Sequence, residues 1–181
     1  MRALQTADLR DRSPVTPLGA LRRGLFAGVV GTAAMTGWQM LAAKLRASGD
    51  EGEQAPEPPP ADPWENASAP AKVAKRIGEG VFQRDVSPDL IPLLTHGMHW
   101  AYGIGWGTVY GLVAGSTGRS GVGDGARFGT AVWIMSYVQL VPMGLYELPW
   151  KYEPQETAFD LSYHVVYGVG VAAAYGALDR G

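Results

Sequence analysis

The sequence predicts an all-α membrane protein: a polytopic four-helix bundle built from two parallel helical-hairpin repeats. The first observation behind this prediction is that four long stretches of the 181-residue chain contain no Asp, Glu, Lys or Arg: 24–43, 90–118, 128–146 and 161–178. A helix of roughly 20 residues crosses a bilayer core of about 30 Å, and each stretch is near or above that length. The alternative, a soluble bundle with a glycine-rich core, accounts less well for four such stretches in a short chain.

The second observation is an internal repeat. The pattern His-x2-Tyr-Gly-x-Gly-x4-Tyr-Gly begins at His99 and again at His164, 65 residues later. The two copies lie in the second and the fourth uncharged stretch. Because each half of the chain then crosses the bilayer twice, both halves have the same orientation, and the repeat is parallel rather than inverted.

The first half begins with a polar N-terminal tail, 1–20, and a membrane helix over about 21–45. Small residues recur in this helix at every fourth position, which favours the close approach of another helix: Ala20, Gly24, Gly28, Thr32 and Thr36. An insertion over 46–89 follows, proline-rich at first and then amphipathic from Pro70 to about Arg84. We expect the amphipathic helix either to pack over the loop side of the bundle or to lie in the interface plane, with basic residues at lipid headgroups.

The other helices of the membrane domain, 21–181, are predicted over about 90–114, 126–146 and 159–178. Four glycines at a spacing of four form a glycine zipper in the first of these, and close helix packing usually offsets their cost in helix propensity: Gly103, Gly107, Gly111 and Gly115. Pro142 is expected to kink the second, because its ring removes one backbone hydrogen bond. The third carries a similar small stripe: Gly168, Ala172 and Gly176.

Composition and motifs exclude several function classes. The absence of cysteine excludes disulfides and thiolate metal sites, and a net charge of −2 gives no sign of a nucleic-acid partner. No phosphate-binding glycine loop, nucleophile elbow or His-Glu-x2-His motif occurs, so the chain is not expected to be an enzyme. Arginines in the short segments favour cytoplasmic termini: Arg22, Arg23, Arg119 and Arg127.

The histidines and nearby carboxylates form the candidate site. Ionisable side chains in membrane helices usually face the bundle interior, and the repeat places His99 and His164 at similar depth on the side opposite the termini. His96, Asp160 and Glu147 are expected at the same membrane face. Four interpretations stay open: hydrogen bonds that fix helix register, a divalent metal such as zinc, a pH response or proton relay, and haem between His99 and His164.

Segment 141–150 (Val-Pro-Met-Gly-Leu-Tyr-Glu-Leu-Pro-Trp), followed by Glu156 and by His164 early in the last helix, resembles the YagU-like bacterial inner-membrane proteins. That family has a proline-glycine-leucine segment, a Pro-Trp pair, an acidic residue and a helix-borne histidine. Its proline-rich loop after the first helix is similar to 56–63. The resemblance implies a multi-pass protein of the bacterial cytoplasmic membrane with a suggested link to acid stress, and it implies no catalytic residues.

These observations lead to one expected function and one alternative. We expect a small integral membrane protein with a structural or stress-related role, which acts by association of its helices with a second copy or with another membrane protein and needs no cofactor. The alternative is a metal- or haem-binding membrane protein that uses His96, His99 and His164 for redox or transport work.

Overall fold

The computed structural model describes residues 16–47 and 61–180. Within these ranges the chain is all-α and has no β-strand, which confirms the predicted fold class at this level. The α-helices are α1 (Pro17–Ala47), α2 (Ala69–Gly80), α3 (Ile91–Thr117), α4 (Val122–Leu140) and α5 (Pro154–Asp179), and the short 3-10 helices η1 (Pro88–Leu90) and η2 (Pro149–Lys151) precede α3 and α5. Most of the predicted N-terminal tail and proline-rich linker lies outside the described residues.

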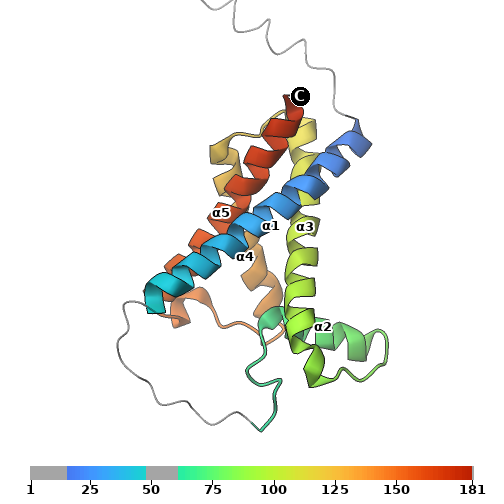
Figure 1. Ribbon diagram of the computed structural model, residues 1–181, viewed down its shortest axis with the longest axis vertical. Coiled ribbons are helices and arrows are strands. Elements are labelled where there is room, and N and C mark those ends of the chain that lie inside the picture. The colour runs from blue at the N-terminus through green and yellow to red at the C-terminus, as the bar shows by residue number, and fades with distance from the viewer. Residues whose placement is uncertain (1–15, 48–60, 181) are drawn as a thin grey trace, which may run out of the picture.

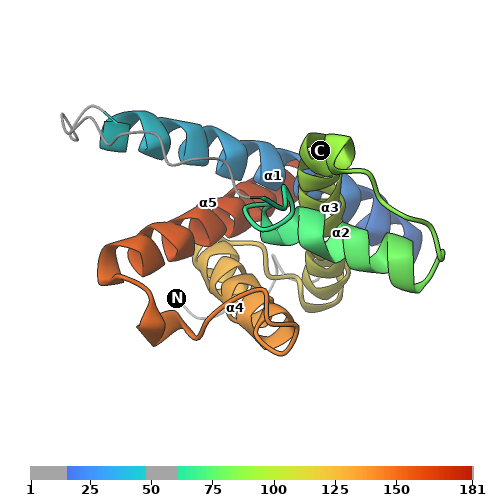
Figure 2. The same ribbon diagram turned by 90° about the horizontal axis from the view of Figure 1, so that it is seen from below.

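The four long helices alternate in direction along the chain. α1 and α4 run away from the end where the C-terminus lies, and α3 and α5 run back toward it (Figure 1). α1 packs against both α3 and α5, and α5 packs against α4. The spatial order is therefore α3, α1, α5, α4, with α2 lying across the far end of the bundle beside α3 (Figure 2).

Glycines bring the backbones of α1 and α3 into direct contact. A methyl group added at Gly24 would lie 2.8 Å from the carbonyl oxygen of Gly107, and one added at Gly28 would lie 2.9 Å from Cα of Ile104. At Gly111 the added methyl group would lie 2.5 Å from Cα of Gly24. The small residues predicted to form packing stripes thus pack against each other inside the chain.

The same kind of contact joins α4 to α5 and α1 to α5. A methyl group at Gly125 of α4 would lie 2.6 Å from the carbonyl oxygen of Gly168 in α5. A methyl group at Gly170 of α5 would lie 3.2 Å from Cα of Gly31 in α1. Three successive helix pairs are therefore held at backbone-contact distance, which glycine allows because it has no side chain at the contact.

Aromatic side chains fill the space between α3 and α4, whose backbones lie further apart. The Phe128 ring of α4 has its centroid 4.9 Å from that of Tyr110 and 6.2 Å from that of Tyr167. Tyr110 also meets Tyr175 edge to face at 5.9 Å. The three tyrosines are buried and the half-buried Phe128 packs against them. The two pairs of Tyr110 have edge-to-face geometry, which is a favoured arrangement of aromatic rings.

The predicted boundaries of the third long helix are wrong at its C-terminal end. α4 ends at Leu140 instead of continuing through a kink to Tyr146. Pro142 has no N–H to continue the ladder, and Gly144 adopts a left-handed φ of 64°. The N–H of Leu145 then bonds the Leu140 carbonyl at 3.0 Å and turns the chain away from the helix axis.

α2 is fixed to both sides of the space between α3 and α4. A small cluster of buried residues anchors it to the start of α3, built from Trp64, Ala67 and Ala71 with Val86, Ile91 and Leu94 packed against them. On its other side the Arg76 guanidinium donates a 2.7 Å hydrogen bond to the Met143 carbonyl oxygen, after α4. α2 therefore packs over the loop side of the bundle, as one of the two interpretations has it. It ends at Gly80, earlier than predicted.

Two of the described helices are long and apolar enough to cross a membrane. They are α1 and α5. α3 and α4 are rich in glycine, tyrosine and tryptophan, and they are not among these candidate spans. Length and hydropathy alone therefore favour a membrane location only weakly, because among the described helices they identify two of the four predicted spans.

Candidate functional site

A cavity of about 330 Å³ lies between the long helices, and α2 contributes to its wall. All five α-helices and the segment after α4 line it: Met35, Gln39, Pro70, Val73, Met98, His99, Tyr102, Ser136, Gln139, Leu140, Met143, Tyr146, Asp160 and His164. Its walls are mixed. Methionine, leucine and valine side chains alternate with imidazole, amide, hydroxyl and carboxylate groups, as is usual for small-molecule sites.

The structure brings the two repeat histidines together at this cavity. His99 comes from α3 and His164 from α5, and both also line a smaller recess of about 50 Å³ deeper in the bundle, beside Tyr167. The shared position follows from the repeat, because each histidine precedes by four residues a glycine, Gly103 or Gly168, that faces the neighbouring helix.

The hydrogen bonds of His164 define its tautomer. Nδ1 lies 2.8 Å from the backbone carbonyl oxygen of Asp160, one turn earlier in α5. A carbonyl oxygen only accepts, so Nδ1 carries the hydrogen and donates. In the neutral ring, Nε2 is then an acceptor. The Asp160 carboxylate lies 3.7 Å from Nδ1 and adds to this orientation.

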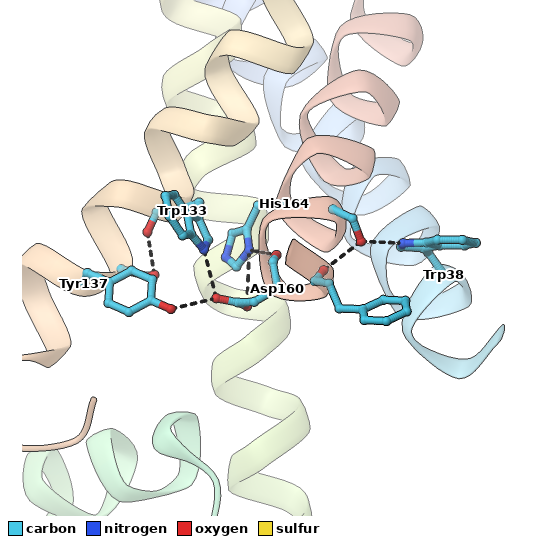
Figure 3. A network of polar contacts seen from close by, with 8 residues as sticks. Trp38, Trp133, Tyr137, Asp160 and His164 are labelled. Atoms are coloured by element: carbon cyan, nitrogen blue, oxygen red, sulfur yellow. Dashed lines mark hydrogen bonds and ion pairs between the residues drawn. The ribbon is translucent and has the colours of Figure 1, made fainter. Parts of the chain in front are cut away.

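Two aromatic donors from α4 hold the Asp160 carboxylate. Its Oδ2 accepts hydrogen bonds from Trp133 Nε1 at 2.9 Å and from Tyr137 Oη at 3.2 Å (Figure 3). Asp160 is therefore partnered across the α4–α5 contact. Sequence reasoning missed both donors. The sequence feature that could have identified them is the spacing of four residues between Trp133 and Tyr137, which places an indole N–H and a phenol on one face of α4.

His99 is less well satisfied than His164. Its Nε2 is buried, and among the described residues no atom forms a hydrogen bond with it. Leaving a buried polar group without a partner costs about 1–3 kcal/mol. Because His99 lines the cavity, a bound molecule with a suitable oxygen atom is one way to recover that cost.

The predicted cluster of His96, His99, His164, Asp160 and Glu147 does not form as one group. His96 lies about one turn before His99 on α3, but it is exposed and does not line the cavity. Glu147 is exposed and pairs with Lys151 at 2.7 Å, because α4 ends early and carries that segment outward. Over residues 16–47 and 61–180, no three His, Cys, Asp or Glu side chains gather in a way that could hold a metal ion.

A second cavity of about 240 Å³ adjoins the first on the side of η2 and the start of α5. Asp160, Tyr137 and Tyr146 line it together with Tyr152, Glu156 and Thr157. Burial raises the pKa of Tyr146 to about 12, and the nearby Asp160 and Tyr152 add to the shift. The Tyr146 phenol is therefore neutral at physiological pH, and Asp160 lies between the two cavities.

Comparison of the chain with protein-family profiles, with curated proteins and with solved structures gave no match. The resemblance to the YagU-like proteins therefore stays a prediction, and the functional argument depends on the site itself.

Proposed function

We propose that the chain is a multi-pass membrane protein in which α1, α3, α4 and α5 each cross the bilayer. The distribution of apolar side chains supports this. The buried contacts are made by glycine, alanine and tyrosine, while large apolar residues of the four helices are exposed: Leu25, Phe26, Val29, Val109, Leu112, Val113, Ile134, Val138 and Leu178. Such outward faces suit lipid, which solvates them at no cost.

The placement of charge supports the same proposal. The whole of α3 lacks Asp, Glu, Lys and Arg, and in the other three long helices these residues lie near the ends. At the end with the termini, Arg23 of α1 pairs with Asp179 of α5 at 2.6 Å. At the opposite end lie Lys44, Glu156 and Asp160. An uncharged band between two charged ends is the pattern that a bilayer selects.

The two hairpins, α1 with α3 and α4 with α5, correspond to the proposed parallel repeats. Gly24 and Gly28 of α1 meet the glycine stripe of α3, and Gly125 and Gly129 of α4 meet that of α5. The insertion containing α2 belongs to the first hairpin. Cytoplasmic termini and a bacterial inner membrane remain part of the proposal, supported by the arginines near the termini and by the YagU-like resemblance.

Within this frame, the function that the geometry supports best is binding of a small amphipathic molecule. The observation that carries it is the 330 Å³ cavity, which is lined by His99 and His164, and His99 has a buried ring nitrogen without a hydrogen-bond partner among the described residues. The volume lies at the low end of the range for ligand sites, about 300–1,000 Å³. This proposal keeps the alternative that the chain binds a ligand, but the ligand is a small organic molecule in place of a metal ion or haem.

The membrane topology can be tested with single cysteines, because the native chain has none. Ser120→Cys lies in the connection between α3 and α4, and Gln155→Cys lies in the first turn of α5. An impermeant maleimide is expected to label these two variants from opposite sides of the membrane, and to leave Ile134→Cys in the middle of α4 unlabelled from either side. Labelling of Ser120→Cys and Gln155→Cys from the same side contradicts the proposed topology.

The binding function can be tested by filling the cavity from α2. Val73 lines the cavity, whereas Ile77, one turn later, is exposed. Protein extracted with its native lipids is expected to retain a small molecule, seen by mass spectrometry, that is depleted in Val73→Trp and kept in Ile77→Trp. Identical sets of retained molecules in all three proteins contradict a binding role for the cavity.

Association between helices is a second candidate function. On α3, Gly97 and Gly105 are exposed, and nothing lies within 4 Å of a methyl group added at either position. Ala101, between them, is exposed as well. This face of α3 is therefore open to another helix. If it mediates dimerisation, Gly105→Leu lowers the cross-linked fraction in membranes; an unchanged fraction contradicts this role.

A further inference from the structure

We propose that the cavity binds a neutral, lipid-soluble ring compound of the quinone and quinol class. This inference rests on the proposed binding function and names its ligand. Three features of the cavity lead to it: the charge of its lining, the hydrogen-bonding capacity of its imidazoles, and its depth beside the bilayer.

The charge of the lining favours a neutral ligand. Among the described lining residues there is no Lys or Arg, so the site offers no cation to a phosphate or a fatty-acid carboxylate. The one carboxylate, Asp160, already accepts from Trp133 and Tyr137, and it does not need a ligand cation. Burial of an unpaired charge is costly, which disfavours charged molecules here.

The polar groups of the lining can serve both redox forms of one molecule. A quinone oxygen accepts hydrogen bonds, whereas a quinol hydroxyl also donates. The Nε2 of His164 is an acceptor in the neutral ring, and the unpartnered Nε2 of His99 can donate when it carries the ring hydrogen. Tyr102 donates to Gln139 Oε1 at 3.2 Å, which leaves the amide nitrogen of Gln139 as another donor. A ring with oxygen atoms at opposite ends matches donors and acceptors presented by separate helices.

The apolar walls and the depth of the site favour a molecule that reaches it from the bilayer. Three methionines, Met35, Met98 and Met143, line the cavity, and their flexible thioethers adapt to flat rings. Asp160 is the last charged residue before the uncharged part of α5, so the cavity lies at the level where headgroups meet hydrocarbon. A polar ring at this level leaves an isoprenoid tail free to extend into lipid.

α2 closes the cavity toward the aqueous side. Pro70 and Val73 contribute to its lining, and Arg76 fixes the helix to the Met143 carbonyl across the space between α3 and α4. The lipid-facing side is bridged by the hydrogen bond of Tyr102 to Gln139, both of which line the cavity. Entry from the bilayer between α3 and α4, at the level of the cavity, therefore breaks this neutral hydrogen bond.

The test uses the full chain in lipid nanodiscs and a tritiated decyl-substituted benzoquinone as the probe, with empty nanodiscs subtracted. Saturable binding to the wild type is expected. His99→Leu removes one buried hydrogen bond, worth about 1–1.5 kcal/mol, so the affinity should fall about tenfold. Val73→Trp should abolish binding, Ile77→Trp should leave it unchanged, and His99→Gln, which keeps a donor, should retain more affinity than His99→Leu.

The outcomes separate this inference from the proposed function. Failure of the probe to bind, while a radiolabelled fatty acid or phospholipid binds the wild type and not Val73→Trp, overturns the quinone class and leaves the binding function intact. Equal quinone affinity in the wild type and in Val73→Trp overturns the cavity as the quinone site. Equal binding of all three probes in both proteins overturns the binding function as well.

Discussion

Replacement of Gly111 by alanine should weaken the contact between α1 and α3. The added methyl group would lie 2.5 Å from both the Ala20 carbonyl oxygen and Cα of Gly24. Ordinary contacts between such atoms are about 3.5–4.0 Å, so the two helices must separate by roughly 1 Å. Both neighbouring atoms belong to the backbone, and no side-chain rotation can relieve the overlap.

The magnitude follows from this geometry. Inserting a methyl group into a closely packed contact costs about 1–3 kcal/mol. Gly105→Ala is the matched control on the same helix, since nothing lies within 4 Å of its added methyl group and alanine gains up to about 1 kcal/mol of helix propensity. Both variants gain this propensity, so they should differ by the cost of the overlap alone, about 1–3 kcal/mol in free energy of unfolding.

Thermal unfolding of detergent-solubilised protein, followed by circular dichroism, measures this difference. For chains of this size each kcal/mol shifts Tm by about 2–4 °C, so Gly111→Ala should melt roughly 2–12 °C below Gly105→Ala. Equal midpoints for the two variants, or a more stable Gly111→Ala, would refute the inference that backbone contact through glycine holds α1 against α3.

Three further predictions concern the polar groups of the bundle. Asp160→Ala leaves the Trp133 indole and the Tyr137 phenol without their acceptor, at about 1–3 kcal/mol for each donor, whereas Asp160→Asn keeps an acceptor. Denaturant unfolding should therefore rank the wild type above Asp160→Asn and Asp160→Ala last. Because the pKa of Tyr146 rises from 10.0 to about 12 in the folded protein, its contribution to stability is complete below pH 10 and lost between pH 10 and about 12. The tyrosinate absorbance that Tyr146→Phe removes should appear only near the upper end of that range. Tyr167→Phe deletes a 2.6 Å hydrogen bond to a backbone carbonyl of α3 and should cost about 0.6 kcal/mol, seen as a small fall in Tm.

The sequence was sufficient to predict the helices and their contact faces, because both depend on local periodicity. Uncharged stretches located α1, α3, α4 and α5, and the spacing of small residues identified Gly24, Gly28, Gly107 and Gly111 as packing positions. The end of α4 was predicted wrongly. A proline near the end of an apolar stretch is compatible with a kink or with termination, and the left-handed turn at Gly144, which decides between them, is not encoded in hydropathy.

The site was predictable only in part. The repeat predicted His99 and His164 on the inner faces of two helices that run in the same direction, and in the structure both residues line the cavity. The partners of Asp160 could not be predicted, because they depend on which face of α4 meets α5. Glu147 was expected at the site because its loop lies on the same side of the membrane. In the structure its side chain is exposed and pairs with Lys151. Side-chain partners across helices thus require tertiary geometry that periodicity alone does not supply.

Because the spatial order is α3, α1, α5, α4, the two hairpins meet along one line, the contact between α1 and α5. Each hairpin is closed by its own glycine contacts, and the hairpins meet mainly where Gly31 of α1 touches Gly170 of α5. A rotation of one hairpin about that line leaves both hairpins intact but alters the separation of α3 and α4. A change in the angle between the two hairpins therefore changes both the volume of the cavity and the distance between the imidazoles of His99 and His164.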